Sequence, residues 1–129
     1  MIYLEIHQVQ RLMKLGFKPP YDLGEVYASR IYYYNDDAWA VGGRITGEDL
    51  ILAPEEVYKE GIRLYSIDEV LDWVHMEGLG LRLDKNINSG YKFTIIDEFG
   101  IEHKGSGGTL NYAVFNTVER YLVKRNKKV

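Results

Sequence analysis

The 129-residue sequence contains no cysteine, and this absence excludes several kinds of site. The chain can have no disulfide scaffold, no cysteine-ligated zinc, no iron–sulfur cluster on its own thiolates and no cysteine nucleophile. A chain without cysteine suits a reducing compartment. We therefore expect a cytoplasmic protein.

Long apolar runs are also absent. No run approaches the roughly 18 residues of a membrane span. Residues 1–5 lack the basic start and apolar core of a secretion signal. The length suits one domain, residues 1–129, which can bury about two thirds of its unfolded surface without a metal. We expect no membrane association.

The net charge of −3 is unevenly distributed. Residues 119–129 carry five basic side chains and one acid, so this end has a net charge of +4 and the remainder −7. Cations at a helix C-terminus complement the helix dipole, which explains the basic end. A nucleic-acid-binding arm is the alternative, but the acidic body would repel phosphate.

The clearest helix start is at Ser66. Its hydroxyl can cap the first turn while Glu69 reaches back to the Ser66 amide. Apolar residues then recur on a 3.6-residue period at Ile67, Val70, Leu71 and Val74. Trp73 borders this stripe, so we expect it to be partly buried at the edge.

The remaining patterns predict an α+β fold in the order α-β-β-β-α-β-β-β-α. Short turns between strands favour antiparallel pairing, and we expect a sheet of about five to six strands with about three helices on it. The sequence predicts helices at 5–15, 66–77 and 110–125, one or two helical turns at 54–60, and strands at 30–34, 38–41, 50–53, 80–84, 91–96 and 101–104.

Parts of the chain resemble known proteins. The stretches 50–54 and 64–73, then a β-hairpin, then Gly108-Thr109-Leu110 with Ala113, resemble small uncharacterised phage and prophage proteins of Gram-positive bacteria. Such proteins look like α-β-α sandwiches, and the resemblance implies no activity. In the second half alone, Gly108-Thr109-Leu110 and Ala113 also resemble the pattern of HicB-type antitoxins.

Residues for catalysis or metal binding do not form a recognisable pattern. His7, His75 and His103 are far apart in sequence, with no HExxH spacing. The adjacent acidic pairs fall in turns or first helical turns, and no serine lies in a G-x-S-x-G motif. We expect no enzyme, no metal site and no cofactor.

The glycine-rich stretch Gly105, Ser106, Gly107, Gly108 and Thr109 is a candidate ligand site. Free amides at a helix start can bind an anion, and glycine lets a phosphate approach. The stretch is not a P-loop, because Gly108 stands where that motif has lysine. The alternative is a flexible loop that ends in an N-cap at Thr109.

Eleven tyrosines are the unusual feature of the composition. In the strand 30–34, Tyr32 and Tyr34 share one face, and Trp39 follows on the expected return strand. If no helix covers that face, Tyr32, Tyr34 and Trp39 form an interface. Helices on both faces are the alternative.

We therefore expect a non-catalytic phage or prophage accessory protein that binds a protein partner and can form a homodimer. Capture of a small anionic or nucleotide-like ligand at Gly105–Thr109 is the second hypothesis.

Overall fold

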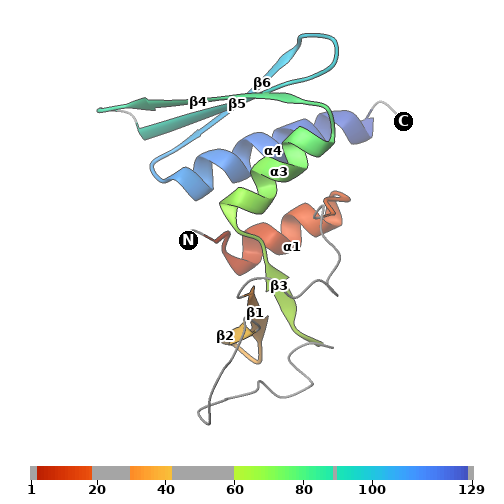
Figure 1. Ribbon diagram of the computed structural model, residues 1–129, viewed down its shortest axis with the longest axis vertical. Coiled ribbons are helices and arrows are strands. Elements are labelled where there is room, and N and C mark those ends of the chain that lie inside the picture. The colour runs from red at the N-terminus through yellow and green to blue at the C-terminus, as the bar shows by residue number, and fades with distance from the viewer. Residues whose placement is uncertain (1–2, 19–29, 42–59, 89, 128–129) are drawn as a thin grey trace.

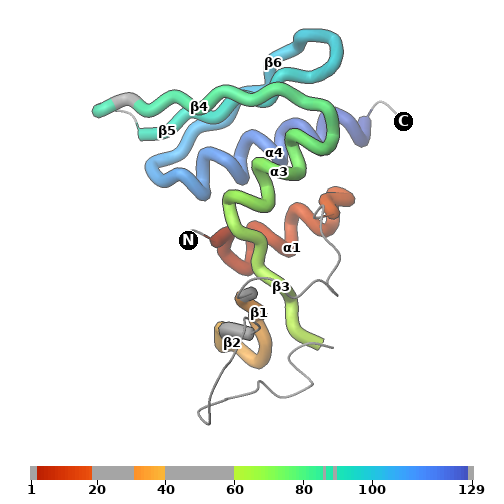
Figure 2. Tube along the Cα trace, viewed as in Figure 1, coloured from red at the N-terminus to blue at the C-terminus, as the bar shows by residue number. Residues whose placement is uncertain are grey.

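The computed structural model describes residues 3–18, 30–41, 60–88 and 90–127. In these residues an α+β fold contains three helices and two three-stranded antiparallel sheets. Figures 1 and 2 show the two sheets at opposite ends of the long axis, with the helices between them. The elements are α1 (Ile6–Lys14), β1 (Arg30–Tyr34), β2 (Asp37–Val41), β3 (Ile62–Leu64), α3 (Ile67–Met76), β4 (Gly80–Asn86), β5 (Gly90–Ile96), β6 (Glu102–Gly107) and α4 (Leu110–Lys127).

The first sheet has the strand order β2-β1-β3. Asn35 and Asp36 have φ angles of 54° and 62°, as expected for the two central residues of a type I′ hairpin turn. β3 was not predicted, because three residues are too few for a periodic pattern. The predicted strand 50–53 lies outside the described residues, as does the predicted helical segment at 54–60 except for Glu60.

The second sheet has the order β4-β5-β6, and the segment α3-β4-β5-β6-α4 is continuous in sequence. Both α3 and α4 lie on the same side of this sheet (Figure 1). The cross-strand rows Leu81–Ile95–His103 and Leu83–Phe93–Gly105 share the face that these helices cover. The opposite face is therefore left to Arg82, Asp84 and their polar neighbours.

The expected single sheet of five to six strands is not confirmed. The chain passes from β3 straight into the cap of α3 at Ser66, so the two strand sets are joined through a helix. Leu4 N donates to Tyr65 O (2.8 Å), and Tyr3 forms an isolated bridge with Ser66. This places α1 between the sheets, and their edges never meet (Figure 2).

One hydrophobic cluster spans both sheets and all three described helices. Trp73 is buried in it, which corrects the expectation of a partly exposed edge residue. Its ring lies 4.8 Å from Phe17 and 6.2 Å from Tyr121, centroid to centroid. Because residues of other elements pack against Trp73, the buried face of α3 includes Trp73, whereas Leu71 is only half-buried.

None of the helices in the described residues is long and apolar enough to cross a membrane.

Candidate functional site

The glycine-rich stretch is not a flexible loop, because β6 continues through Gly105, Ser106 and Gly107. A Cβ on Gly105 would lie 2.5 Å from Thr117 Oγ1, and one on Gly107 would lie 2.7 Å from the Ala113 amide nitrogen. These glycines let α4 approach the sheet closely. Gly108 and Thr109 form the connection, and Tyr112 N donates to Thr109 Oγ1 (3.4 Å), which confirms the N-cap.

A broad hollow of about 1230 Å³ lies beside this strand. Gly105 and Ser106 line it, whereas Gly107, Gly108 and Thr109 do not. Its charged lining residues are four cations and two acids, so it favours anions weakly. These residues are Lys85, Lys92, Lys104, Arg120, Asp84 and Glu119.

The free edge of β6 is closed by side chains of α4. Arg120 Nη1 donates to the carbonyl of Lys104, and Asn116 Nδ2 donates to the carbonyl of Ser106, both at 2.9 Å. Lys104 and Ser106 are two residues apart, so their carbonyls point to the same side of the strand, and each accepts a side-chain bond that occupies it. Side chains that occupy an edge in this way prevent edge-to-edge pairing.

The opposite edge, β4, has no comparable cover. Within the described residues β4 pairs with β5 alone, and its other side faces no strand. Leu81 and Leu83 lie on the helix-covered face of the sheet yet are 42% and 46% exposed. α4 packs on β5 and β6 and α3 contacts β4, yet this cover leaves both leucines almost half exposed. β4 is a seven-residue strand that carries both leucines and charges, and among the described residues its outer edge is open to pairing.

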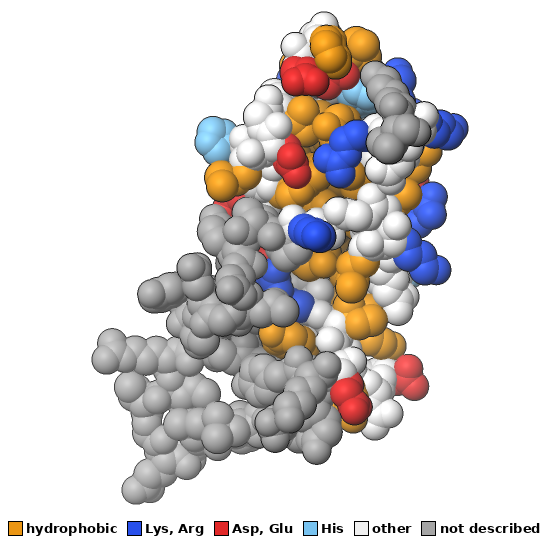
Figure 3. Space-filling model, turned by 90° about the vertical axis from the view of Figure 1, so that its right-hand side faces the viewer, with side chains coloured by type: hydrophobic (Ala, Val, Ile, Leu, Met, Phe, Trp, Pro, Cys, Tyr) orange, Lys and Arg blue, Asp and Glu red, His pale blue; other side chains and the backbone are white. Residues whose placement is uncertain are grey.

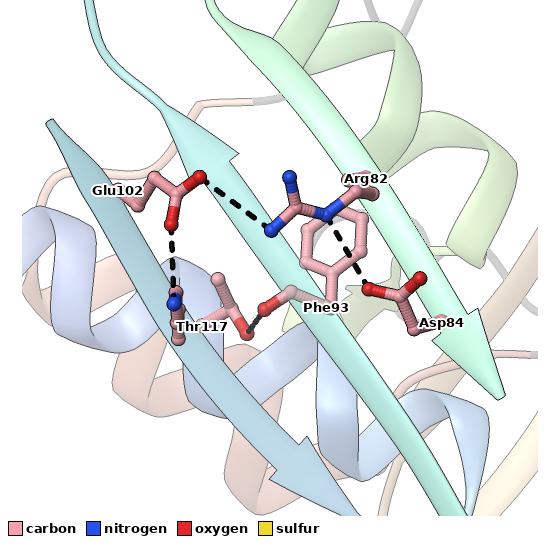
Figure 4. A network of polar contacts seen from close by, with 6 residues as sticks. Arg82, Asp84, Phe93, Glu102 and Thr117 are labelled. Atoms are coloured by element: carbon pink, nitrogen blue, oxygen red, sulfur yellow. Dashed lines mark hydrogen bonds and ion pairs between the residues drawn. The ribbon is translucent and has the colours of Figure 1, made fainter. Parts of the chain in front are cut away.

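A charge ladder runs across the outer face of the same sheet (Figure 4). Arg82 lies 3.4 Å from Asp84 and 3.5 Å from Glu102, and Lys104 lies 3.1 Å from Glu102. The hydrogen bond with Lys104 lowers the pKa of Glu102. These pairs are exposed and add little stability, so they leave Arg82 and Asp84 available to other partners.

The β5–β6 hairpin holds a buried Asp97–His103 pair that the sequence did not indicate. His103 Nε2 donates to Asp97 Oδ2 (3.0 Å), while the amides of Phe99 and Ile101 donate to Asp97 Oδ1 (2.9 and 3.0 Å). The bond from His103, with these two amides, holds the pKa of Asp97 below its ordinary value. The His103 ring meets Tyr121 edge-on at 5.2 Å. Hairpin register could have revealed the pair, because both residues lie next to the turn.

A smaller hollow of about 400 Å³ opens beside this pair. Lys124 and Arg125 of α4 line one part of it and Glu77 and Glu98 another. Figure 3 shows this end of the molecule, where Lys and Arg side chains follow one border of an apolar strip. Every oxygen of Asp97 is already bonded within the hairpin, so the pair fixes the turn.

The predicted interface residues lie together on the first sheet. Tyr32 is buried, and half-buried Tyr34 and Trp39 pack against it. Tyr32 stands between Trp39 on β2 and Arg63 on β3. This arrangement supports a small aromatic cluster on that face, and its use as an interface stays a prediction.

Arg63 and Glu69 form a buried ion pair that connects β3 to α3. Arg63 Nη1 lies 2.6 Å from Glu69 Oε2, with side-chain exposures of 6% and 17%. Arg63 also stacks over the Tyr65 ring at 5.4 Å. Sequence reasoning assigned Glu69 to the helix cap alone, and the structure adds the ion pair to that role.

The described residues contain no group of three or more His, Cys, Asp or Glu side chains that could hold a metal ion. Comparisons with protein-family models, curated proteins and solved structures gave no match. The resemblances to phage proteins and HicB-type antitoxins therefore stay predictions.

Proposed function

We propose that this chain is a non-catalytic binding module that contacts another protein through the β4 edge. The partner adds an extended strand to the second sheet, where main-chain hydrogen bonds give affinity and alternate side chains give specificity. The observation that carries the proposal is the contrast between two edges of one sheet. α4 side chains close β6, whereas β4 presents Leu81 and Leu83.

The apolar contribution of this edge is modest but sufficient for a specific contact. Fully burying a leucine is worth about 1.5–3 kcal/mol, and these two are already more than half-buried, so the pair adds roughly 2 kcal/mol. Main-chain pairing supplies the rest. The chemistry expected of the partner is an extended segment with apolar side chains facing the helices and charges facing Arg82 and Asp84.

Selection of peptides from a random decapeptide library on the immobilised protein tests this proposal. Enriched peptides should alternate apolar and polar residues. A Leu83→Lys variant should bind them at least tenfold more weakly, because the charge lies on the face that must be buried. Met13→Lys on α1 is the matched control, since Met13 is similarly exposed at 49% and lies away from this edge. Unchanged binding by Leu83→Lys would overturn the proposal.

The phage or prophage origin enters this proposal through the resemblance alone. A small accessory protein working by contact in the host cytoplasm is compatible with a binding edge and needs no catalytic group.

Anion binding is the second candidate function, supported by the cations of the broad hollow. Lys92 and Lys104 come from the sheet and Arg120 from α4, on three separate elements around Gly105 and Ser106. A nucleotide at 100 times its Kd would add about 2.7 kcal/mol of stability. A thermal shift with a nucleotide that is lost in Lys92→Ala would favour this function over the first.

A further inference from the structure

We propose that the partner of β4 is β4 of a second copy of this chain, paired antiparallel about a two-fold axis at Leu83. The inference rests on the proposed function and names its partner. The product is a six-stranded antiparallel sheet with the helices of both copies on one face. Such a two-fold contact uses the same surface patch on both subunits.

The faces of the strand limit which registers can form. Cross-strand neighbours point to the same face of a sheet, and a slip of one residue moves every side chain to the other face. In a two-fold pairing that continues the sheet, the axis must therefore pass through a residue and not between two residues. The interior candidates are Leu81, Arg82, Leu83, Asp84 and Lys85.

Charge then selects one of these five. An axis at Arg82, Asp84 or Lys85 places that charge opposite its own copy, which destabilises the pair. An axis at Leu81 leaves Arg82 opposite the glycine at the start of the strand, without a charged partner. An axis at Leu83 places Arg82 of each copy opposite Asp84 of the other and Leu83 opposite Leu83.

The contact between Arg82 and Asp84 within one chain already places both charges where this register requires them. Arg82 Nε already lies 3.4 Å from Asp84 Oδ2, and both side chains are about half exposed on the outer face. Two such pairs brought together antiparallel give four charges that alternate in sign. On the helix-covered face the two copies of Leu83 meet, and each Leu81 is covered by the stem of the opposite Lys85.

The closed β6 edge sets the size of the assembly. If both edges were open, pairing could continue into a filament. α4 side chains occupy two carbonyls of β6, so among the described residues the second sheet has one open edge, β4. Pairing of this sheet through β4 therefore joins two copies and does not continue to a third through β6.

Sedimentation equilibrium of the full chain and its charge-reversal variants tests the register. The wild type should be a concentration-dependent dimer. Arg82→Asp and Asp84→Arg should each raise the dimer Kd about ten- to thirtyfold, because each reverses two symmetric cross-strand pairs. The double variant should return to within about threefold of the wild type. Glu98→Arg, an exposed reversal in the β5–β6 turn, is the control and should change nothing.

Mixing the Arg82→Asp and Asp84→Arg variants is the most stringent test of the register. One then carries two acids at positions 82 and 84 and the other two arginines, so every cross-strand pair between them is complementary. The mixture should form a heterodimer at least as tight as the wild-type dimer. No mixing rescue, or an equal effect of Glu98→Arg, would overturn the Leu83-centred register.

Hydrogen exchange of the β4 amides separates failure of this inference from failure of the proposed function. A chain that stays monomeric at every concentration, with rapidly exchanging outward amides on β4, refutes the homodimer and leaves the edge open to another protein. Protected outward amides in the monomer would mean that the edge is covered within the chain, and both proposals would fall.

Discussion

Replacing Glu69 by alanine should cost about 3–4 kcal/mol of folding stability. The change leaves the guanidinium of Arg63 buried without the counter-ion that the described residues give it, and its Nε and Nη2 already lack hydrogen-bond partners. Breaking a buried pair from one side costs about 3–5 kcal/mol, and the 17% exposure of Glu69 favours the lower end. Loss of the acceptor for the Ser66 amide adds about half a kcal/mol.

That loss is a large share of the 5–15 kcal/mol that stabilises an ordinary domain. For a chain of this length it should lower Tm by roughly 10–15 °C. Urea denaturation followed by Trp73 fluorescence measures the free energy of unfolding, since Trp73 lies buried in α3. Asp68→Asn, an exposed change in the same helical turn, should cost no more than about 1 kcal/mol.

A double-mutant cycle distinguishes loss of the ion pair from loss of the cap. Glu69→Gln keeps an oxygen for the Ser66 amide but removes the charge, so most of the loss should persist. Arg63→Met combined with Glu69→Leu should recover to within about 1 kcal/mol of the wild type, because well-packed apolar groups can replace a buried pair. A cost below 1 kcal/mol for Glu69→Ala, or strict additivity in the cycle, would refute the reasoning.

Three further changes test the second sheet. Gly105→Ala should destabilise by about 2–3 kcal/mol in urea denaturation, because its Cβ would lie 2.7 Å from the Thr117 amide nitrogen, whereas Gly108→Ala has open space and should be neutral. Thr117→Val removes a hydroxyl that donates to two backbone carbonyls at 2.9 Å and should cost about 1 kcal/mol in the same assay. The lowered pKa of Asp97 contributes folding stability that is complete above the ordinary pKa of 3.8 and is lost as pH falls through the lower pKa of the folded state. The free energy of unfolding of Asp97→Asn should therefore fall less steeply with decreasing pH than that of the wild type.

Local signals in the sequence predicted most of the helices and hairpins. The S-x-x-E pattern located α3, and both reciprocal bonds of that capping box are present. Alternation located β5, and the turn residues Asn35 and Asp36 located the first hairpin. These features depend on neighbours within a few residues, so sequence is sufficient for them.

Features that depend on distant contacts were not predictable in the same way. Glycines in a single sequence predict a loop, yet Gly105 and Gly107 lie in a strand. They are glycines because a Cβ at either position would clash with α4. Trp73 is buried because Phe17, far away in sequence, covers it. The strand β3 is too short to give a period. In each case a tertiary neighbour decided the outcome and local propensity did not.

The proposed binding edge, β4, also depends on distant contacts. Alternation at residues 80–84 identifies a strand, but nothing in it says whether a neighbour lies on one side or two. The difference between β4 and β6 arises from α4, whose Arg120 and Asn116 donate across to one edge and cannot reach the other. The charges of β4 can pair with those of another strand only because this edge is open among the described residues. In the proposed dimer, Arg82 of each copy lies opposite Asp84 of the other in a single register, because only the Leu83-centred pairing opposes unlike charges.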